Sequence, residues 1–310
     1  MGADRDQREG SKPDEGEARR EDAPVERARR FAVVGDPVAH SKSPRMHAAA
    51  FRSLRMPHTY EAIRVAPEEL GRVVRELREG KYDGLNVTVP HKEKVLAFVD
   101  EVDPSARAVE AANTLVRNAS GTVVAHNTDV PALVAELRDL APARNASAWG
   151  QKQALVLGSG GAARAAVVAL AVIGARLITV RARNVERATK LGELVMRAGA
   201  PALLRAQPLA ATDQDDGFGV VVQTTSCGME GGPPGEAVSG AIDWDRLAPD
   251  TVVLDAVYSP PETLFLRAAF RRGLPMKNGL GMLTAQGALA FESWLGVRAP
   301  RDVMRAALVS

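Results

Sequence analysis

The sequence has one cysteine, few aromatic residues and no long apolar run. Cys227 is the only cysteine among 310 residues, which excludes an intramolecular disulfide and any metal site built from several cysteines. A lone cysteine also fits the reducing cytoplasm, where we expect the protein to work. The longest apolar run, residues 165–175, is too short to cross a bilayer. A membrane is therefore not an expected partner, and nucleic acid is not one either, because no basic block with interleaved aromatic residues occurs.

The rest of the composition is typical of globular proteins. Hydrophobic residues make up 45% of the chain and charged residues 25%, and a chain of this length predicts two domains. Residues 1–30 differ, because they are crowded with charged side chains and contain no aromatic residue. Such a segment buries too little apolar surface to offset the entropy lost on ordering. It is therefore predicted to be a disordered charged tail.

From Phe31 onward, strand-like and helix-like segments alternate, which is typical of an α/β fold with right-handed crossovers. In the first half, strands are predicted at residues 31–34, 60–65 and 84–89, helices at 44–54, 67–79 and 92–99, and a hairpin at 108–115 with 122–126. After a polar connection at residues 145–153, strands are predicted at 154–157, 176–180, 219–223 and 251–255. Further helices are predicted at 162–173, 185–198, 284–295 and 301–308, and loops at 213–216 and 231–240.

A glycine-rich turn follows the predicted strand ALVL and opens an apolar helix. The turn consists of Gly158, Ser159, Gly160, Gly161, Ala162 and Ala163, and it has the spacing G-x-G-x-x-A. Small residues at this spacing let the backbone approach a pyrophosphate, which the free N–H groups at the helix N-terminus can bind. The turn with its flanking elements favours dinucleotide binding over a plain loop between strand and helix.

The end of the next predicted strand indicates which dinucleotide is bound. A site for NAD has an acidic side chain there, which holds the ribose 2′-hydroxyl. This chain instead reads ITVRARN, with Arg181 and Arg183 before Asn184 and no acidic residue. A guanidinium group matches a 2′-phosphate, so NADP is the predicted cofactor. The alternative is that either arginine is an ordinary solvated charge at a strand end.

Polar side chains also gather where the apolar segments of the first half end. Ser41 and Ser43 precede a predicted helix, where their hydroxyls could bind a carboxylate or simply cap the helix. The other polar positions are Asn86, Thr88, His91, Lys92, Asn113, Asn127, Thr128 and Asp129. A lysine and an aspartate brought together in a closed cleft can move a proton. His91 is the competing acid or base, because the unperturbed pKa of histidine is near neutral.

Together, these motifs resemble those of the shikimate dehydrogenases. VVGDPVAHSKSP, NVTVPHK, AANTL, HNTD, GSGGAAR, TTSCGM, DAVYSPPETLFL and NGLGMLTAQ occur in the order and at about the spacing of that family, from Phe31 to the C-terminus. The resemblance implies NADPH-dependent reduction of 3-dehydroshikimate to shikimate, on the pathway to chorismate and the aromatic amino acids, without a metal. It also implies two domains. Residues 31–130, completed by 281–310, would form a discontinuous α/β substrate domain, and residues 131–280 a Rossmann-type NADP-binding domain with a parallel sheet.

The resemblance also implies a role for individual residues. The substrate carboxylate would be held by Ser41, Ser43 and Tyr258, and the ring hydroxyls would be met by Thr88, Lys92, Asn113, Asp129 and Gln286. Lys92 and Asp129 would be the catalytic pair, with Lys92 as the proton donor. The cofactor would be held by residues 158–163, Arg181, Arg183, Asn184, Thr224, Gly279 and Met282. Ala182, Arg183 and Asn184 stand where the family commonly has Asn-Arg-Thr, and there Arg181 could add a contact to the 2′-phosphate.

Two alternative functions accompany this interpretation. One is a quinate/shikimate dehydrogenase of broader substrate or NAD use, although the pair of serines argues against a preference for quinate. The other is a ligand-sensing relative that kept the fold and lost the chemistry, against which the presence of both Lys92 and Asp129 argues. The expected assembly is a monomer or a homodimer that binds small molecules.

Overall fold

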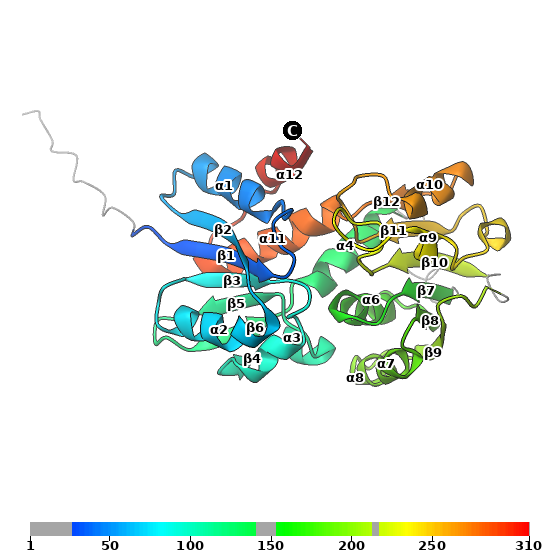
Figure 1. Ribbon diagram of the computed structural model, residues 1–310, viewed down its shortest axis with the longest axis horizontal. Helices are drawn as coiled ribbons and strands as arrows, with labels where there is room; N and C mark the ends of the chain where they lie inside the picture. The colour runs from blue at the N-terminus through cyan, green and yellow to red at the C-terminus, as the bar shows by residue number, and fades with distance from the viewer. Residues whose placement is uncertain (1–26, 141–152, 213–216, 310) are drawn as a thin grey trace, which may run out of the picture.

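The structure is a computed structural model that describes residues 27–140, 153–212 and 217–309. It has two halves, each built on a six-stranded sheet with flanking helices (Figure 1). Two long helices, α4 (Asp129–Leu140) and α11 (Leu280–Leu295), lie between the halves and pack against each other. The predicted α/β architecture is thereby confirmed. Within the described residues, no helix is both long and apolar enough to span a membrane.

The first sheet has the strand order β2-β1-β3-β5-β6-β4. Its strands are β1 (Arg30–Gly35), β2 (Thr59–Arg64), β3 (Gly84–Val87), β4 (Glu101–Val102), β5 (Thr114–Arg117) and β6 (Val123–His126). β1 runs parallel to β2 and β3, whereas β5 is antiparallel to both β3 and β6. The predicted hairpin is present as β5 and β6, but its first strand begins at Thr114 and not at residue 108, because residues 104–109 form a helix. Because β1 and β3 are parallel, the segments that follow them, with Ser41 and Lys92, leave the same edge of the sheet.

The second sheet is entirely parallel, with the strand order β12-β11-β10-β7-β8-β9. Its strands are β7 (Gln153–Leu157), β8 (Leu177–Ala182), β9 (Leu203–Pro208), β10 (Phe218–Gln223), β11 (Val252–Asp255) and β12 (Met276–Lys277). Read from β9, this is the doubly wound order of dinucleotide-binding folds, in which the first strand lies between the second and the fourth. The order reverses between β7 and β10, and ligands bind at such a switch point.

Helices cover both sheets. In the first half they are α1 (Ser43–Ser53), η1 (Pro67–Glu69), α2 (Leu70–Arg78), η2 (Lys94–Ala97), α3 (Pro104–Val109) and the C-terminal α12 (Arg301–Val309), which packs on α1. In the second half they are α6 (Gly161–Val172), α7 (Val185–Lys190), α8 (Gly192–Arg197), α9 (Glu236–Ser239), η3 (Trp244–Arg246) and α10 (Leu264–Arg271). The end of the chain therefore returns to the first half (Figure 1).

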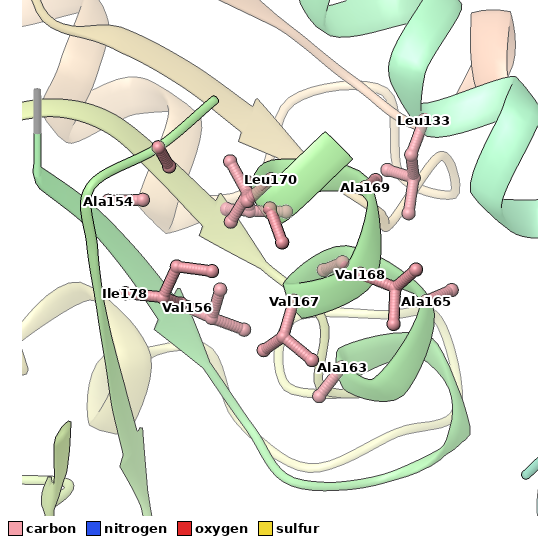
Figure 2. Close-up of a cluster of buried hydrophobic side chains, with 14 of the residues drawn as sticks. Leu133, Ala154, Val156, Ala163, Ala165, Val167, Val168, Ala169, Leu170 and Ile178 are labelled. Atoms are coloured by element: carbon pink, nitrogen blue, oxygen red, sulfur yellow. The ribbon is translucent and has the colours of Figure 1, made fainter. Parts of the chain in front are cut away.

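The core of the second half is packed around α6. Figure 2 shows Val167 and Leu170 of this helix beside Val156 of β7 and Ile178 of β8, and all four side chains are fully buried. Leu133 of α4 belongs to the same cluster. Burying each such side chain contributes roughly 1.5–3 kcal/mol. Because α4 begins at Asp129, this packing also fixes the position of one predicted catalytic group.

In the first half, one predicted strand is too long and one predicted helix is wrong. The strand predicted at residues 84–89 ends at Val87, and the Val89 side chain is 54% exposed. The helix predicted at residues 92–99 is only the short 3₁₀ helix η2. The backbone carbonyl of Lys92 accepts a hydrogen bond from Ala112 N–H at 2.8 Å. Its partner is therefore a distant residue and not the N–H four residues later, which a helix starting here would use.

In the second half, the predicted helix at residues 185–198 is divided at Leu191 and Gly192 into α7 and α8. The Gly-rich segment at 231–240, predicted as a loop, contains the one-turn helix α9. Three sequence predictions lie largely or wholly outside the described residues: the charged tail at 1–30, the connection at 145–153 and the loop at 213–216.

Candidate active site

Lys92 and Asp129 form an ion pair at the junction of the two halves. Lys92 follows the turn after β3, and Asp129 is the first residue of α4. The distance from Lys92 Nζ to Asp129 Oδ2 is 2.6 Å, and the two side chains are 15% and 3% exposed. A pair this short and this well shielded has a fixed geometry, which exposed ion pairs lack.

Amide groups surround the carboxylate of Asp129. Asn113 Nδ2 donates to Asp129 Oδ1 at 2.9 Å and lies 3.3 Å from Gln286 Oε1 on α11. The backbone N–H of Asp129 donates to Asn127 Oδ1, and Asn113 Oδ1 accepts from the N–H of Thr128. The structure therefore brings Lys92, Asn113, Asp129 and Gln286 together from four separate segments.

His91, the competing acid or base, lies outside this cluster. Its side chain is fully buried, and its Nε2 lies 2.7 Å from the backbone carbonyl oxygen of Val65. Because a carbonyl oxygen only accepts, Nε2 carries the proton and donates it. His91 is a buried structural residue, and Lys92 is the titratable group placed beside Asp129.

The serine pair lies at the N-terminus of α1, next to two tyrosines from distant segments. Ser43 N–H donates to Ser41 Oγ at 3.3 Å, and the hydroxyl of Tyr258 is hydrogen-bonded to the Ser41 side chain and the backbone of Lys42. The hydroxyl of Tyr60, on β2, is hydrogen-bonded to Ser43. Burial raises the pKa of Tyr258 and of Tyr60, so both hydroxyls stay protonated and can donate.

Thr88 approaches the same edge of the sheet through a close contact with Gly35. A β-carbon at position 35 would lie 2.4 Å from Thr88 Cγ2, so only glycine fits at the end of β1. Thr88 is half-buried and directly follows β3, four residues before Lys92 in the sequence.

The glycine-rich turn between β7 and α6 fits a dinucleotide. Gly158 has φ +114°, which favours glycine, and a β-carbon there would meet Thr224 Oγ1 at 2.7 Å. A β-carbon at Gly160 would meet nothing within 4 Å, so open space lies beside the first turn of α6. Ser159 and Ala162, in the same turn, are partly exposed. The small residues, the helix N-terminus and the switch point between β7 and β10 are the features that hold a pyrophosphate.

The two arginines of the predicted 2′-phosphate site are placed very differently. Arg181 is fully buried within β8, where it donates to the Ala241 carbonyl at 2.8 Å and lies over the Phe218 ring. The prediction that Arg181 contacts the cofactor is therefore wrong. Arg183 follows β8 and is exposed. Asn184 caps α7 by accepting from Arg187 N–H at 2.8 Å, which uses its carbonyl oxygen for the helix.

Three further predicted cofactor residues lie near the ends of the central strands. Thr224 follows β10 and donates its hydroxyl to the Leu157 carbonyl at 2.6 Å, which ties it to the start of the glycine-rich turn. Gly279 precedes α11, and a β-carbon there would lie 2.2 Å from the Ala256 carbonyl oxygen. Met282 is buried in the core cluster around α6.

Sequence reasoning missed a cluster of ion pairs that joins the two halves. Glu93 pairs with Arg187 of α7 and with Arg164 of α6, at 3.4 Å for the latter. Glu110 pairs with Arg164 at 3.0 Å and with Arg197 of α8. Glu93, the residue next to Lys92, is thereby held to the second half.

The site and the glycine-rich turn are in direct contact. A β-carbon at Gly161, the first residue of α6, would lie 3.0 Å from Lys92 Cβ. The lysine side chain therefore packs against the backbone that opens the predicted pyrophosphate site. Tyr258, which follows β11 of the second sheet, likewise contacts Ser41 of the first half. Both contacts place residues of the two halves around one site.

Comparisons with known proteins agree with this arrangement. Residues 33–115 match the model of the shikimate dehydrogenase substrate binding domain, and residues 279–309 match that of the shikimate 5′-dehydrogenase C-terminal domain. The shikimate dehydrogenase (NADP(+)) of Methylobacterium radiotolerans is 42% identical over 272 residues, which are 87% of this chain and 92% of the relative. Among solved structures, shikimate 5-dehydrogenase from Thermus thermophilus in complex with NADP(H) and shikimate is 35% identical, with a TM-score of 0.74 and coverage of 90% of this chain and 98% of that one. Quinate dehydrogenase from Corynebacterium glutamicum in complex with NAD is 27% identical, with a TM-score of 0.76 and coverage of 91% and 99%. This chain belongs to the shikimate dehydrogenase family.

Proposed function

We propose that this protein is an NADP-dependent shikimate dehydrogenase, which reversibly reduces 3-dehydroshikimate to shikimate and so serves the biosynthesis of chorismate and the aromatic amino acids. The observation that carries the proposal is the buried Lys92–Asp129 pair, 2.6 Å long, whose lysine packs against Gly161 of the glycine-rich turn. A proton-transfer pair beside a dinucleotide-binding turn is what the reduction of a carbonyl group requires.

Ser41, Ser43 and Tyr258 bind the substrate carboxylate in this proposal. Their hydroxyls converge near the N-terminus of α1, where the helix dipole favours an anion. The Lys42 side chain is turned away toward the Leu308 carbonyl, 3.5 Å from Nζ, so hydroxyl and backbone groups, not this ammonium, meet the carboxylate.

Lys92 moves the proton in this proposal. During reduction, Nζ–H donates a proton to the carbonyl oxygen as negative charge develops there, and in the reverse direction the neutral amine takes the proton from the substrate hydroxyl. Asp129 holds the ammonium in place, and Asn113 holds Asp129 by donating to its second oxygen at 2.9 Å. Thr88 and Gln286 complete the set of groups that contact the ring hydroxyls and fix the ring against Lys92.

NADPH supplies the hydride when it is bound. Residues 158–163 would hold its pyrophosphate, with free N–H groups at the start of α6. The exposed guanidinium of Arg183 would hold the 2′-phosphate, Gly279 and Met282 would lie along the nicotinamide, and Thr224 would also contact the cofactor. The contact between Lys92 and Gly161 keeps bulk water from the pair from one side.

We also propose the domain division and the setting in which the enzyme works. Residues 31–130 with 281–310 form the substrate domain and residues 131–280 the NADP-binding domain, so that α4 and α11 carry the chain across the boundary. The single cysteine supports a cytoplasmic location. The proposed assembly is a monomer or a homodimer, with small molecules, and neither nucleic acid nor a membrane, as its ligands.

A quinate/shikimate dehydrogenase of broader specificity is the second candidate. Its support is the burial of Arg181, which leaves Arg183 as the guanidinium at the end of β8 and reduces the preference for NADP that two arginines would give.

One absorbance assay of reduced nicotinamide separates these functions. Purified protein is supplied with shikimate or quinate, each with NADP or NAD. The proposed function predicts that the highest kcat/KM belongs to shikimate with NADP. Comparable values for quinate or NAD would favour the second candidate, and no turnover in any combination would favour the ligand-sensing relative.

A further inference from the structure

Tyr60 is a buried residue that is hydrogen-bonded to two separate segments beside the proposed substrate site. It lies on β2, the outer strand of the first sheet, and its side chain is 8% exposed. Its hydroxyl donates to Asn86 Oδ1 at 2.7 Å, and its oxygen accepts from the Ser43 hydroxyl. One phenol group therefore connects the N-terminus of α1 with the centre of β3.

The amide of Asn86 carries this connection onward. Its Nδ2 donates to the Asn113 carbonyl at 3.0 Å and lies 3.1 Å from Thr114 Oγ1. Because the Asn113 carbonyl oxygen can only accept, the Asn86 NH₂ group must face it, and the amide oxygen must face Tyr60. The side chain of Asn113 in turn donates to Asp129. Buried hydrogen bonds thus run from Ser43 through Tyr60 and Asn86 to the backbone of Asn113, whose side chain holds Asp129, the partner of Lys92.

The ring of Tyr60 stacks on the ring of His47 from α1. The two ring centroids are 4.3 Å apart, and the rings are 8° from parallel. His47 is fully buried, and burial lowers its pKa to about 3, so the ring under Tyr60 is neutral. Burial raises the pKa of Tyr60 well above its ordinary value, so the phenol keeps its proton. These features suit Tyr60 to hold its neighbours and not to exchange protons with substrate.

We propose that Tyr60 is a positioning residue that holds the Ser43 side chain at the N-terminus of α1, where the substrate carboxylate is proposed to bind, and holds the Asn86 amide within β3. This inference rests on the proposed function, because Ser43 is a proposed carboxylate ligand. The carboxylate takes no part in the chemical step, so contacts to it are equally strong in the ground state and the transition state. A residue that acts through such contacts changes KM and leaves kcat nearly unchanged.

The test is the variant Tyr60→Phe, alone and combined with Ser43→Ala. Phenylalanine keeps the stack on His47 and removes only the hydroxyl. We expect KM for shikimate to rise about tenfold, with kcat within about twofold of wild type and KM for NADP unchanged. In the Ser43→Ala background, the further effect of Tyr60→Phe should fall below about twofold, because the hydroxyl that Tyr60 holds is gone.

The matched control is Tyr82→Phe. Tyr82 is buried to the same degree, at 5% exposed, but its ring lies under Arg30 and Lys81, 5.4 and 5.7 Å from the ring centroid, away from the site. Equal effects of Tyr60→Phe and Tyr82→Phe would overturn the proposal. So would fully additive effects of Tyr60→Phe and Ser43→Ala on KM, or a loss of kcat at constant KM.

Calorimetric titration with shikimate separates a failure of this inference from a failure of the proposed function. If the wild-type protein binds shikimate but does not oxidise it, the proposed function is contradicted. The role of Tyr60 is still tested in that case, because Tyr60→Phe should bind shikimate about tenfold more weakly. Wild-type protein that neither binds nor oxidises shikimate overturns both.

Discussion

His47 makes the stability of this protein sensitive to mild acid. Its ring is fully buried between aromatic side chains, with the centroids of Tyr60, Trp294 and Phe51 at 4.3, 5.5 and 6.3 Å. Neither ring nitrogen has a hydrogen-bond partner among the residues that the structure describes. Protonating the ring in place would bury an uncompensated charge, and burial accordingly lowers its pKa from 6.5 to about 3.

The size of the effect follows from the difference between the folded and unfolded pKa values. As pH falls below 6.5, the unfolded chain binds a proton at this histidine while the folded chain does not, so folding loses stability until the folded pKa of about 3 is reached. At about 1.4 kcal/mol for each pH unit, the loss between pH 7.5 and pH 5 is about 2 kcal/mol, and near pH 4 it is about 3 kcal/mol.

The assay compares urea unfolding of wild type and His47→Phe at about pH 7.5 and about pH 5, followed by circular dichroism. We expect the wild type to lose about 2 kcal/mol more than the variant over this interval. His40→Gln, which changes a histidine with a 58% exposed side chain, is the control and should follow the wild type. Identical pH dependence of wild type and His47→Phe would refute the reasoning.

Three further predictions concern other groups. Arg183→Ala should raise KM for NADPH about tenfold and leave KM for NADH unchanged, and equal changes in both would mean that Arg183 does not bind the 2′-phosphate. Burial raises the pKa of Asp255 from 3.8 to about 6, so this carboxyl destabilises the fold as pH rises through that interval. Unfolding titrations should therefore show Asp255→Asn gaining about 2 kcal/mol on wild type between about pH 4 and pH 7, and a constant difference would contradict this. Glu93→Gln should lower the thermal unfolding temperature modestly and weaken its dependence on salt, because it removes the carboxylate that pairs with Arg164 and Arg187. An unchanged salt dependence would show that these pairs do not hold the two halves together.

Sequence patterns alone could not decide whether His91 or Lys92 is the acid or base of the site. Both residues follow the same apolar strand, and the pattern of residue types predicts only that a titratable group stands at its end. The resemblance to a known family favoured Lys92, and the fold supplies the physical reason. The Lys92 carbonyl is bonded to Ala112 N–H and the His91 ring to the Val65 carbonyl, so the turn directs one side chain to Asp129 and buries the other. Ala112 and Val65 are remote in sequence, and no local pattern reveals them.

The error at Arg181 has a similar cause. The pattern placed the strand end at Val180, but β8 continues to Ala182. β8 lies between β7 and β9 in a parallel sheet covered on both faces, and all of its residues from Ile178 to Ala182 are buried, whatever their polarity. Arg181 is therefore inside and Arg183, beyond the last strand residue, is outside. The partner of Arg181, the Ala241 carbonyl, is 60 positions away in sequence, so its polar environment could not be anticipated.

Contacts between the two halves were the least predictable feature. Glu93 and Arg187 are separated by 94 positions, and Glu110 and Arg197 by 87, so their pairing depends on how the halves meet. The elements themselves were well predicted, because hydrophobic periodicity is a local property. The glycine-rich turn was also recognisable, since the tight turn from β7 to α6 requires a positive φ at Gly158, and this requirement is local in sequence.

The measurement that tests the central claim most directly is the turnover number of Lys92→Met with shikimate and NADP. Methionine keeps an unbranched side chain against Gly161 and removes the ammonium that pairs with Asp129. Lys94→Met, which changes an exposed lysine two positions away, is the matched control. We predict that Lys92→Met lowers kcat by about two orders of magnitude or more, while Lys94→Met retains wild-type turnover. Near-native kcat in Lys92→Met would contradict the assignment of Lys92 as the group that moves the proton.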